Sequence, residues 1–258
     1  MNLIYMCVFH QQNYVNLLKL LIESISLRAN MNNETTEILV MTSLLFQPLI
    51  QFFLSKYKLP INYYILNLNT LFEAGCARLH VFQWKKIDKY AKILYLDTDI
   101  LINSDINVLF NLEIVPSKVY ALEEGLISNE SNFYGSEFFD FTKYDKNQTA
   151  FTSGILYFYN SVEIKQLFQD ITNHIKTHIY INKNSIPSCL DQPFIVYNAI
   201  VQNKYDNQLL KEYAENNPLD VNNKKIIYHF PGGPGCYEDK NYKMKVFWEK
   251  IDLFWTNI

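Results

Sequence analysis

Short apolar runs alternate with segments of helical spacing over roughly the first 100 residues. Each run is about four to eight residues long and has no polar face, which predicts a buried strand. Between the runs, apolar side chains recur at intervals of three and four residues, as at Leu17, Leu20 and Leu21, which predicts amphipathic helices. The predicted strands are 4–9, 37–42, 61–66 and 92–96, and the predicted helices are 13–27, 47–57 and 79–90.

This alternation predicts an α/β fold. Its spacing suits strand–helix–strand crossovers, so we expect a Rossmann-like, mostly parallel central sheet flanked by helices. Ligands of such sheets bind beyond the carboxyl ends of the strands. Functional side chains should therefore follow the strands at 4–9 and 92–96.

The second half of the chain has a less regular pattern. We predict strands at 119–123, 155–159 and 225–229 and helices at 161–175 and 192–202, whereas 125–148 is polar and aromatic without a clear period. No internal repeat, low-complexity tract or linker separates the two halves. We therefore expect a single domain over residues 1–258.

Composition and charge exclude several classes of protein. The chain has 49% hydrophobic and 19% charged residues, which is typical of a folded protein. Its 23 basic and 26 acidic residues give a net charge of −3, so a nucleic-acid partner is not expected. No apolar run is long enough to span a membrane, and the N-terminus predicts a strand rather than a signal peptide. The four scattered cysteines suit reduced thiols and a cytoplasmic location.

Glycine is scarce and clustered. The chain has seven, whereas average usage of about 7% would give roughly 18. Three of them, Gly232, Gly233 and Gly235, lie in one short window, which indicates that the backbone there needs unusual freedom.

Two carboxylates interrupt the apolar run 93–102. Asp97 and Asp99 lie two residues apart, and burying them is costly unless a positive charge lies close by. No lysine or arginine is near in sequence, so a divalent cation is the expected partner, and oxygen ligands favour Mg²⁺ or Mn²⁺. The alternative is an Asp that caps the next helix beside a solvated neighbour.

Four sequence blocks occur in a family-like order. They are Arg78-Leu79 before KILYLDTDILI, FTSGIL at 151–156, Asp191-Gln192-Pro193, and HFPG at 229–232. In these blocks the chain resembles family 8 of the retaining glycosyltransferases, the glycogenin and galactosyltransferase-like group, which has the GT-A fold. The resemblance covers roughly residues 3–240 and implies a single GT-A domain.

The resemblance assigns roles to individual positions. It implies that Asp97, Asp99 and His229 hold the metal, Mn²⁺ or Mg²⁺, and that Asp191 and Gln192 are the catalytic pair at the donor sugar. Asp191 also suits a helix N-cap before Pro193, and both roles are compatible. The implied donor-binding residues are Phe9, His10, Tyr14, Arg78, Asp97, Thr98, Asp99, Thr152, Ser153, Gly232, Gly233, Gly235 and Lys240.

Two positions depart from the family pattern. Thr152 stands where the family usually has Asn, which bears on the preference for the donor sugar. Gly235 stands where the family has a lysine on the donor phosphates. Either Lys240 or Lys243 folds back to supply this charge, or the amides of the glycines bind the phosphates instead.

The resemblance implies metal-dependent transfer of a hexose from a UDP-sugar to a hydroxyl of a glycan, lipid or protein, with retention at the anomeric carbon. The nucleotide would bind to residues of about 1–105, and the donor sugar and acceptor to about 106–258. A homodimer is compatible with the sequence. One alternative is a non-catalytic UDP-sugar- or glycan-binding module. Another is a sugar nucleotidyltransferase, which the loop at 10–13 disfavours because it has neither glycine nor lysine.

Overall fold

The computed structural model describes residues 1–182, 186–233 and 236–256. Helices and strands alternate through the first half, as the hydrophobic pattern predicts. In chain order, with η for 3₁₀-helices, the elements are β1 (Asn2–Val8), α1 (Asn13–Arg28), β2 (Thr36–Thr42), α2 (Gln47–Leu54), β3 (Ile61–Ile65), α3 (Leu71–Gly75), η1 (Cys76–Gln83), η2 (Ile87–Lys89), β4 (Lys92–Leu96), β5 (Ile100–Ile102), α4 (Asn107–Asn111), β6 (Val119–Leu126), η3 (Ser136–Phe138), β7 (Thr149–Tyr159), α5 (Val162–Ile181), α6 (Gln192–Val201), β8 (Tyr205–Asp206), η4 (Leu209–Glu212), β9 (Ala214–Asn216), β10 (Ile227–His229) and α7 (Tyr237–Thr256).

A central sheet has the strand order β3-β2-β1-β4-β7-β6-β8 within the described ranges. Strands β3, β2, β1 and β4 run parallel, β7 is antiparallel to both β4 and β6, and β8 is parallel to β6. This confirms the predicted α/β fold with a mostly parallel sheet. The carboxyl ends of β1 and β4 lie side by side, because the two strands pair directly.

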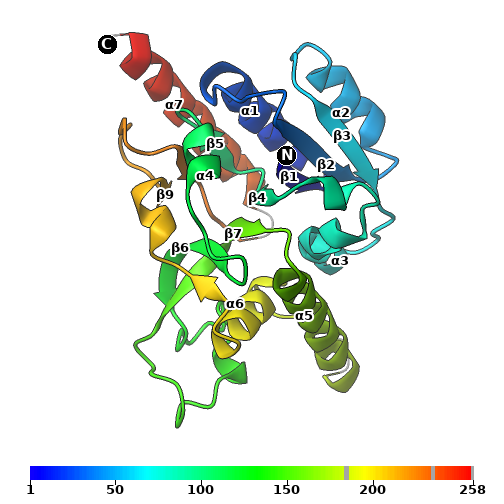
Figure 1. Cartoon of the computed structure of the whole chain (residues 1–258), viewed down its shortest axis with the longest axis vertical. Coiled ribbons are helices and arrows are strands. Elements are labelled where there is room, and N and C mark those ends of the chain that lie inside the picture. The colour runs from blue at the N-terminus through cyan, green and yellow to red at the C-terminus, as the bar shows by residue number, and fades with distance from the viewer. Residues whose placement is uncertain (183–185, 234–235, 257–258) are drawn as a thin grey trace.

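Helices cover both faces of this sheet (Figure 1). Alternate side chains of β1 point to opposite faces: Ile4 and Met6 pack with α1 and α2, whereas Leu3 and Tyr5 pack with η1, α5 and α6. Both sets are fully buried. Because both faces of the sheet are covered, the strands have apolar side chains on both sides and read as continuous apolar runs.

A smaller sheet has the order β5-β10-β9. Helix α7 packs beside this sheet and α1 (Figure 1), where the third core cluster joins Leu17, Tyr228, Phe230, Phe247 and Trp248. Sequence reasoning did not predict α7. Its apolar positions are mostly aromatic and lie among lysines and acids, which blurs the helical pattern.

The sequence predicts an α-helix over 79–90, and this prediction is wrong. The segment instead contains two 3₁₀-helices, η1 and η2. The reason lies in its buried positions Val81, Trp84, Ile87 and Tyr90, which recur every three residues. That interval matches the 3₁₀-helix, which has three residues per turn, better than the α-helix. The predicted helix 47–57 also ends earlier, as α2 stops at Leu54.

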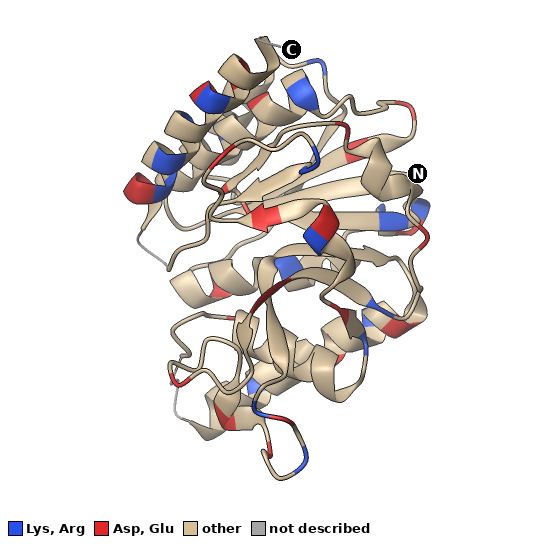
Figure 2. Cartoon of the chain, turned by 90° about the vertical axis from the view of Figure 1, so that its left-hand side faces the viewer, with Lys and Arg blue, Asp and Glu red and all other residues tan. Residues whose placement is uncertain are grey.

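Acidic and basic residues are interspersed along the ribbon in Figure 2, including along α7. This distribution agrees with the small net charge of −3. In the part of the chain that the structure describes, the helices are too short or too polar to cross a bilayer.

Candidate active site

A cavity of about 640 Å³ opens beyond the carboxyl ends of β1 and β4, where ligands of α/β sheets bind. It collects every predicted site residue that the structure describes. They are Phe9, His10, Tyr14, Arg78, Asp97, Thr98, Asp99, Thr152, Ser153, Asp191, Gln192, His229, Gly232, Gly233 and Lys240. Gly235 lies outside the described residues.

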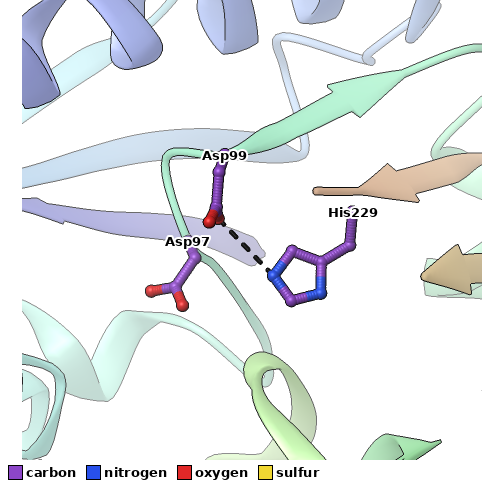
Figure 3. Close-up of side chains that lie close together, drawn as sticks. All are labelled: Asp97, Asp99 and His229. Carbon is purple, nitrogen blue, oxygen red and sulfur yellow. Dashed lines mark ion pairs between the residues drawn. The ribbon is translucent and has the colours of Figure 1, made fainter. Parts of the chain in front are cut away.

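The predicted metal ligands all line this cavity and lie close together (Figure 3). Asp97 and Asp99 occupy the turn between β4 and β5, and His229 ends β10. Antiparallel pairing of β5 with β10 brings them together, since the amide of Phe230 donates to the carbonyl of Asp99 at 2.9 Å. One ligand atom from each of the three side chains lies within 4.8 Å of the others.

These three side chains fit a divalent cation. Asp99 is 4% exposed, and its Oδ1 has no hydrogen-bond partner although it lies 3.5 Å from Nε2 of His229. A buried carboxylate oxygen without a partner is costly, and a cation would remove that cost. Carboxylate ligands suit Mg²⁺ and Mn²⁺. Among the described residues, no other group of three His, Cys, Asp or Glu side chains is arranged to hold a metal.

Asp99 also has a basic partner that lies far from it in sequence. Nζ of Lys240, from the first turn of α7, lies 2.6 Å from Oδ2 of Asp99, and this lysine is buried. Burial opposes ionisation of Asp99, but Lys240 and His229 outweigh it and hold the pKa of this carboxyl below its usual range. Lys243 instead pairs with Asp239 on the surface. Of the two lysines considered, Lys240 therefore folds back into the site.

Gly232 leaves the room that this lysine needs. A Cβ at Gly232 would lie 3.0 Å from Cε of Lys240, which is closer than side chains normally pack. Part of the glycine window thus accommodates a lysine side chain rather than only a tight backbone turn.

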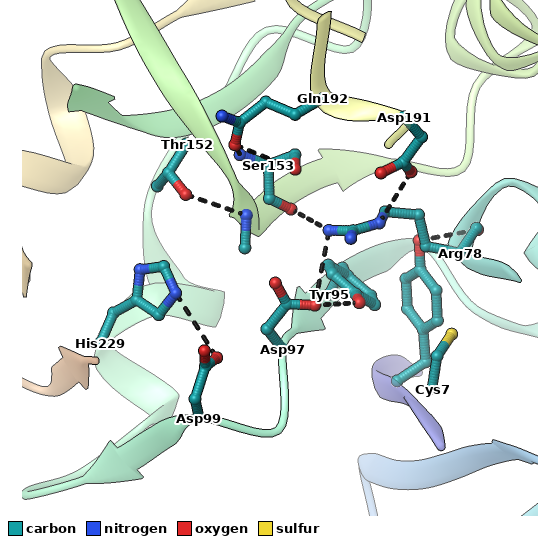
Figure 4. A network of polar contacts seen from close by, with 12 residues as sticks. Cys7, Arg78, Tyr95, Asp97, Asp99, Thr152, Ser153, Asp191, Gln192 and His229 are labelled. Atoms are coloured by element: carbon teal, nitrogen blue, oxygen red, sulfur yellow. Dashed lines mark hydrogen bonds and ion pairs between the residues drawn. The ribbon is translucent and has the colours of Figure 1, made fainter. Parts of the chain in front are cut away.

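Arg78 is a buried cation at the centre of a polar network (Figure 4). Its Nε lies 3.0 Å from Oδ2 of Asp191, and its Nη1 lies 3.5 Å from Oδ1 of Asp97. Nη1 also donates to the carbonyl of Ser153 at 2.5 Å, and the guanidinium lies over the ring of Tyr95, 4.6 Å from its centroid. Arg78 therefore ties the turn after β4 to the start of α6.

Asp191 stands at the N-cap position of α6 but does not cap the helix with its side chain. The carboxylate instead points to Arg78 (Figure 4). Burial raises the pKa of Asp191 to about 6, against the opposing effect of Arg78. This carboxyl is therefore poised to ionise near neutral pH.

Gln192 has a fixed amide. Its Oε1 accepts from the amide of Ser153 at 2.9 Å and from the hydroxyl of Ser153 at 3.2 Å, and its Nε2 donates to the carbonyl of Phe133 at 3.3 Å. The hydroxyl of Thr152 accepts from the amide of Gly154 at 3.2 Å. Ser153, on the central strand β7, thus orients the side chain of Gln192, one of the two predicted catalytic residues.

The aromatic side chains after β1 differ in their surroundings. Phe9 is buried in the core and also lines the cavity. His10 is exposed, in a left-handed conformation with φ of 65°, and Tyr14 meets the ring of Tyr237 edge-on at 6.4 Å. Tyr14 also packs against the core and lines the cavity, so Phe9 and Tyr14 both fit the core interpretation and the site interpretation.

The structure adds residues that sequence reasoning missed. Gly154, Glu124 and Tyr134 line the same cavity, and Asn216 contacts His229 behind it. Gly154 stands inside the FTSGIL block and Glu124 directly follows the predicted strand 119–123, so both had a sequence signal. Asn216 had none, because only the pairing of β9 with β10 places it beside His229.

Comparisons with known proteins agree with this geometry. Residues 77–234 match the sequence profile described as glycosyl transferase family 8. The galactosyltransferase LgtC, solved with donor and acceptor sugar analogues, is 14% identical, with a TM-score of 0.62 and coverage of 96% of each chain. Mouse xyloside xylosyltransferase 1 is 10% identical, with a TM-score of 0.62 and coverage of 89% of this chain and 98% of that one. No curated protein matches the sequence.

A third structure is longer than this chain. The bifunctional glycosyltransferase WbbM is 15% identical, with a TM-score of 0.61 over 97% of this chain. The match spans only half of the WbbM chain. At these identities the likeness to solved structures concerns the fold, which is that of GT-A glycosyltransferases.

Proposed function

The chain belongs to glycosyl transferase family 8, and on this premise we propose that it transfers a hexose from a UDP-sugar to an acceptor hydroxyl with retention of configuration. We assign the nucleotide chiefly to residues 1–105 and the donor sugar and acceptor to residues 106–258. The acceptor is a glycan, lipid or protein hydroxyl.

One observation carries this proposal: Asp97, Asp99 and His229 meet within 4.8 Å in the cavity beyond the carboxyl ends of β1 and β4. These residues would hold Mn²⁺ or Mg²⁺, which supplies a Lewis acid for the charge that develops on the departing diphosphate. The partnerless Oδ1 of Asp99 supports the same assignment.

The chain's own residues would do the remaining work. Asp191, held by Arg78, would place a negative charge beside the sugar as positive charge develops at its anomeric carbon. Gln192 cannot rotate freely, because Ser153 occupies its oxygen, so its NH₂ group faces a fixed direction. Such preorganised groups lower a barrier without reorganising during the reaction.

Lys240 would serve the donor phosphates. It is the lysine nearest the predicted metal ligands, and it reaches the cavity from α7 rather than from the family's usual position at Gly235. If the ammonium group of Lys240 moved from Asp99 to a bound diphosphate, it would keep a charge-assisted hydrogen bond in both positions. A lysine in the site that stands in for the family lysine supports a working enzyme rather than a binding module that has lost turnover.

The test measures release of UDP from UDP-glucose, UDP-galactose and UDP-N-acetylglucosamine, with Mn²⁺ and with EDTA. Wild-type protein should turn over one of these donors only with metal, and Asp97→Asn with Asp99→Asn should abolish turnover. Asp88→Asn is the matched control, because Asp88 is an exposed aspartate that pairs with Lys165 on the surface. It should leave turnover unchanged.

Two results would count against the proposal. Full activity of the double variant in EDTA would show that the two aspartates hold no catalytic metal. Tight binding of a UDP-sugar without any turnover would favour the non-catalytic binding module instead.

A further inference from the structure

The imidazole of His229 has a partner on the side away from Asp99. Its Nδ1 lies 2.7 Å from Oδ1 of Asn216. The contact follows from the fold, because β9 and β10 run parallel and pair Asn216 directly with His229. Adjacent side chains in such a pair lie on the same face of the sheet.

The amide of Asn216 is held on its other side by a carboxylate. Its Nδ2 donates to Oε1 of Glu124 at 3.3 Å, and Glu124 is hydrogen-bonded by the side chain of Tyr134. Tyr134 can approach Glu124 because the next residue is Gly125. A Cβ at Gly125 would lie only 2.4 Å from the Tyr134 ring. The end of β6 therefore brings an acidic side chain up to Asn216.

These contacts determine which nitrogen of His229 carries the proton. An unprotonated carboxyl oxygen only accepts hydrogen bonds, so the NH₂ group of Asn216 must face Glu124 and its carbonyl oxygen must face His229. A carbonyl oxygen also only accepts, so Nδ1 of His229 must be the donor. In the neutral imidazole, Nε2 is then left with a free lone pair, directed at Asp99 3.5 Å away.

We propose that Asn216, oriented by Glu124, is a positioning residue that fixes His229 in the tautomer able to bind a metal through Nε2. This inference rests on the proposed metal site. In the opposite tautomer Nε2 would donate its proton to Asp99 and be closed to a cation. Histidine ligands of metals generally donate their other N–H to such a partner, and its loss costs about 10- to 100-fold in metal affinity.

The experiment uses the full chain without added nucleotide. Long-range ¹H–¹⁵N NMR reports the tautomer of His229 in metal-free protein, and calorimetry with MnCl₂ reports metal affinity. Asn216→Leu should shift His229 toward the Nε2–H tautomer and weaken Mn²⁺ binding about 10- to 100-fold. Asn216→Asp loses the donor to Glu124 but keeps an acceptor beside Nδ1, so it should keep the Nδ1–H tautomer.

Asn62→Leu is the matched control, since Asn62 also donates its amide to a glutamate, Glu37, but lies on β3 at the edge of the sheet. It should change neither readout. If Asn216→Leu does not fold, Asn216→Ser replaces it, because serine is too short to reach the ring.

The outcomes separate this inference from the proposed function. An Nδ1–H tautomer and unchanged Mn²⁺ affinity in Asn216→Leu would overturn the role of Asn216 while leaving the metal site intact. If wild-type protein bound no Mn²⁺, the proposed metal site would be wrong. The metal-free tautomer would then still show whether Asn216 controls His229.

Discussion

Nζ of Lys240 lies 2.6 Å from Oδ2 of Asp99, although the lysine comes from α7 and the aspartate from the turn after β4. Both side chains are buried. Removal of either partner of a buried ion pair strongly destabilises the fold, because the other charge is then left without compensation. This pair makes α7 part of the site. One prediction therefore concerns Lys240 itself, and another concerns the packing of α7.

Lys240→Met should destabilise the metal-free protein and weaken donor binding. Breaking a buried pair costs about 3–5 kcal/mol in the free energy of unfolding, because Asp99 is left charged in the interior. Mn²⁺ should recover much of this loss by taking over the neutralisation, so the metal should raise Tm more in the variant than in wild type. Loss of a charge-assisted contact should weaken UDP binding by about tenfold or more. Thermal unfolding with EDTA or Mn²⁺, and calorimetry with UDP, measure these effects.

Lys243→Met is the control for this lysine. Lys243 pairs with Asp239 on the exposed side of the same helix, and exposed pairs contribute little stability. It should match wild type in Tm and in UDP affinity. Equal UDP affinity of the Lys240 and Lys243 variants would contradict a phosphate-binding role for Lys240.

Phe247→Ala should loosen the attachment of α7. The Phe247 ring meets those of Tyr228 at 4.9 Å and Phe230 at 5.5 Å, and a large-to-small change in such a core costs about 3–5 kcal/mol. Because α7 carries Lys240, UDP affinity should fall as well. Urea unfolding measures the first effect, with Val246→Ala, a change at a partly exposed position on the same helix, as the control that stays within about 0.5 kcal/mol. Unaltered stability of Phe247→Ala would mean that this cluster does not anchor α7.

Gly154→Ala should damage the metal site directly. The added Cβ would lie 2.7 Å from Cε1 and 2.8 Å from Nε2 of His229, so the imidazole must move. A displacement of about 1 Å in a catalytic group can cost about 100-fold in rate, and we expect a loss of that order in metal-dependent turnover. Gly233→Ala is a control for Mn²⁺ affinity, because nothing lies within 4 Å of its Cβ position and Gly233 is a predicted donor-binding residue rather than a metal ligand. Normal Mn²⁺ affinity in Gly154→Ala would show that His229 is not a ligand.

Asp191 should make stability depend on pH. Burial raises its pKa in the folded chain to about 6, above about 3.9 in an unfolded chain, so the unfolded state loses this proton first as pH rises. The contribution of Asp191 to stability is therefore full below about pH 4 and is lost as pH rises through about 6. Between these values, Asp191→Asn should gain stability relative to wild type. Parallel pH profiles for the two proteins in denaturant unfolding would refute this assignment.

The same ionisation should appear in the activity. If the Asp191 carboxylate acts beside the donor sugar, kcat should rise as pH increases through about 6. Asp191→Asn should show a low rate without this rise, and its UDP affinity should stay close to that of wild type. A loss of UDP affinity alone would make Asp191 a structural residue.

The sequence predicted the sheet and most of the site because these depend on local patterns. Apolar runs such as 92–96 and the position of Asp97 and Asp99 after a buried strand are visible in one dimension, and strand ends converge in any parallel sheet. His229 was assigned through the family resemblance, and the antiparallel pairing of β5 with β10 brings it to the aspartates. The 3₁₀ path of η1 and the whole of α7 were not predicted. In the first segment the buried positions recur every three residues, an interval that in sequence also predicts an α-helix. In α7 aromatic residues among lysines and acids obscure the helical period.

By itself, then, the sequence determined the α/β class, the family resemblance and the identity of the three candidate ligands. Only the tertiary structure decided which groups surround those ligands: the charges of Lys240 at Asp99 and of Arg78 between Asp97 and Asp191, and the neutral amide of Asn216 behind His229. Nothing near the two aspartates in sequence indicated these partners. Buried charges must be compensated within a few ångströms in space, and the fold supplies those neighbours from wherever in the chain they happen to lie.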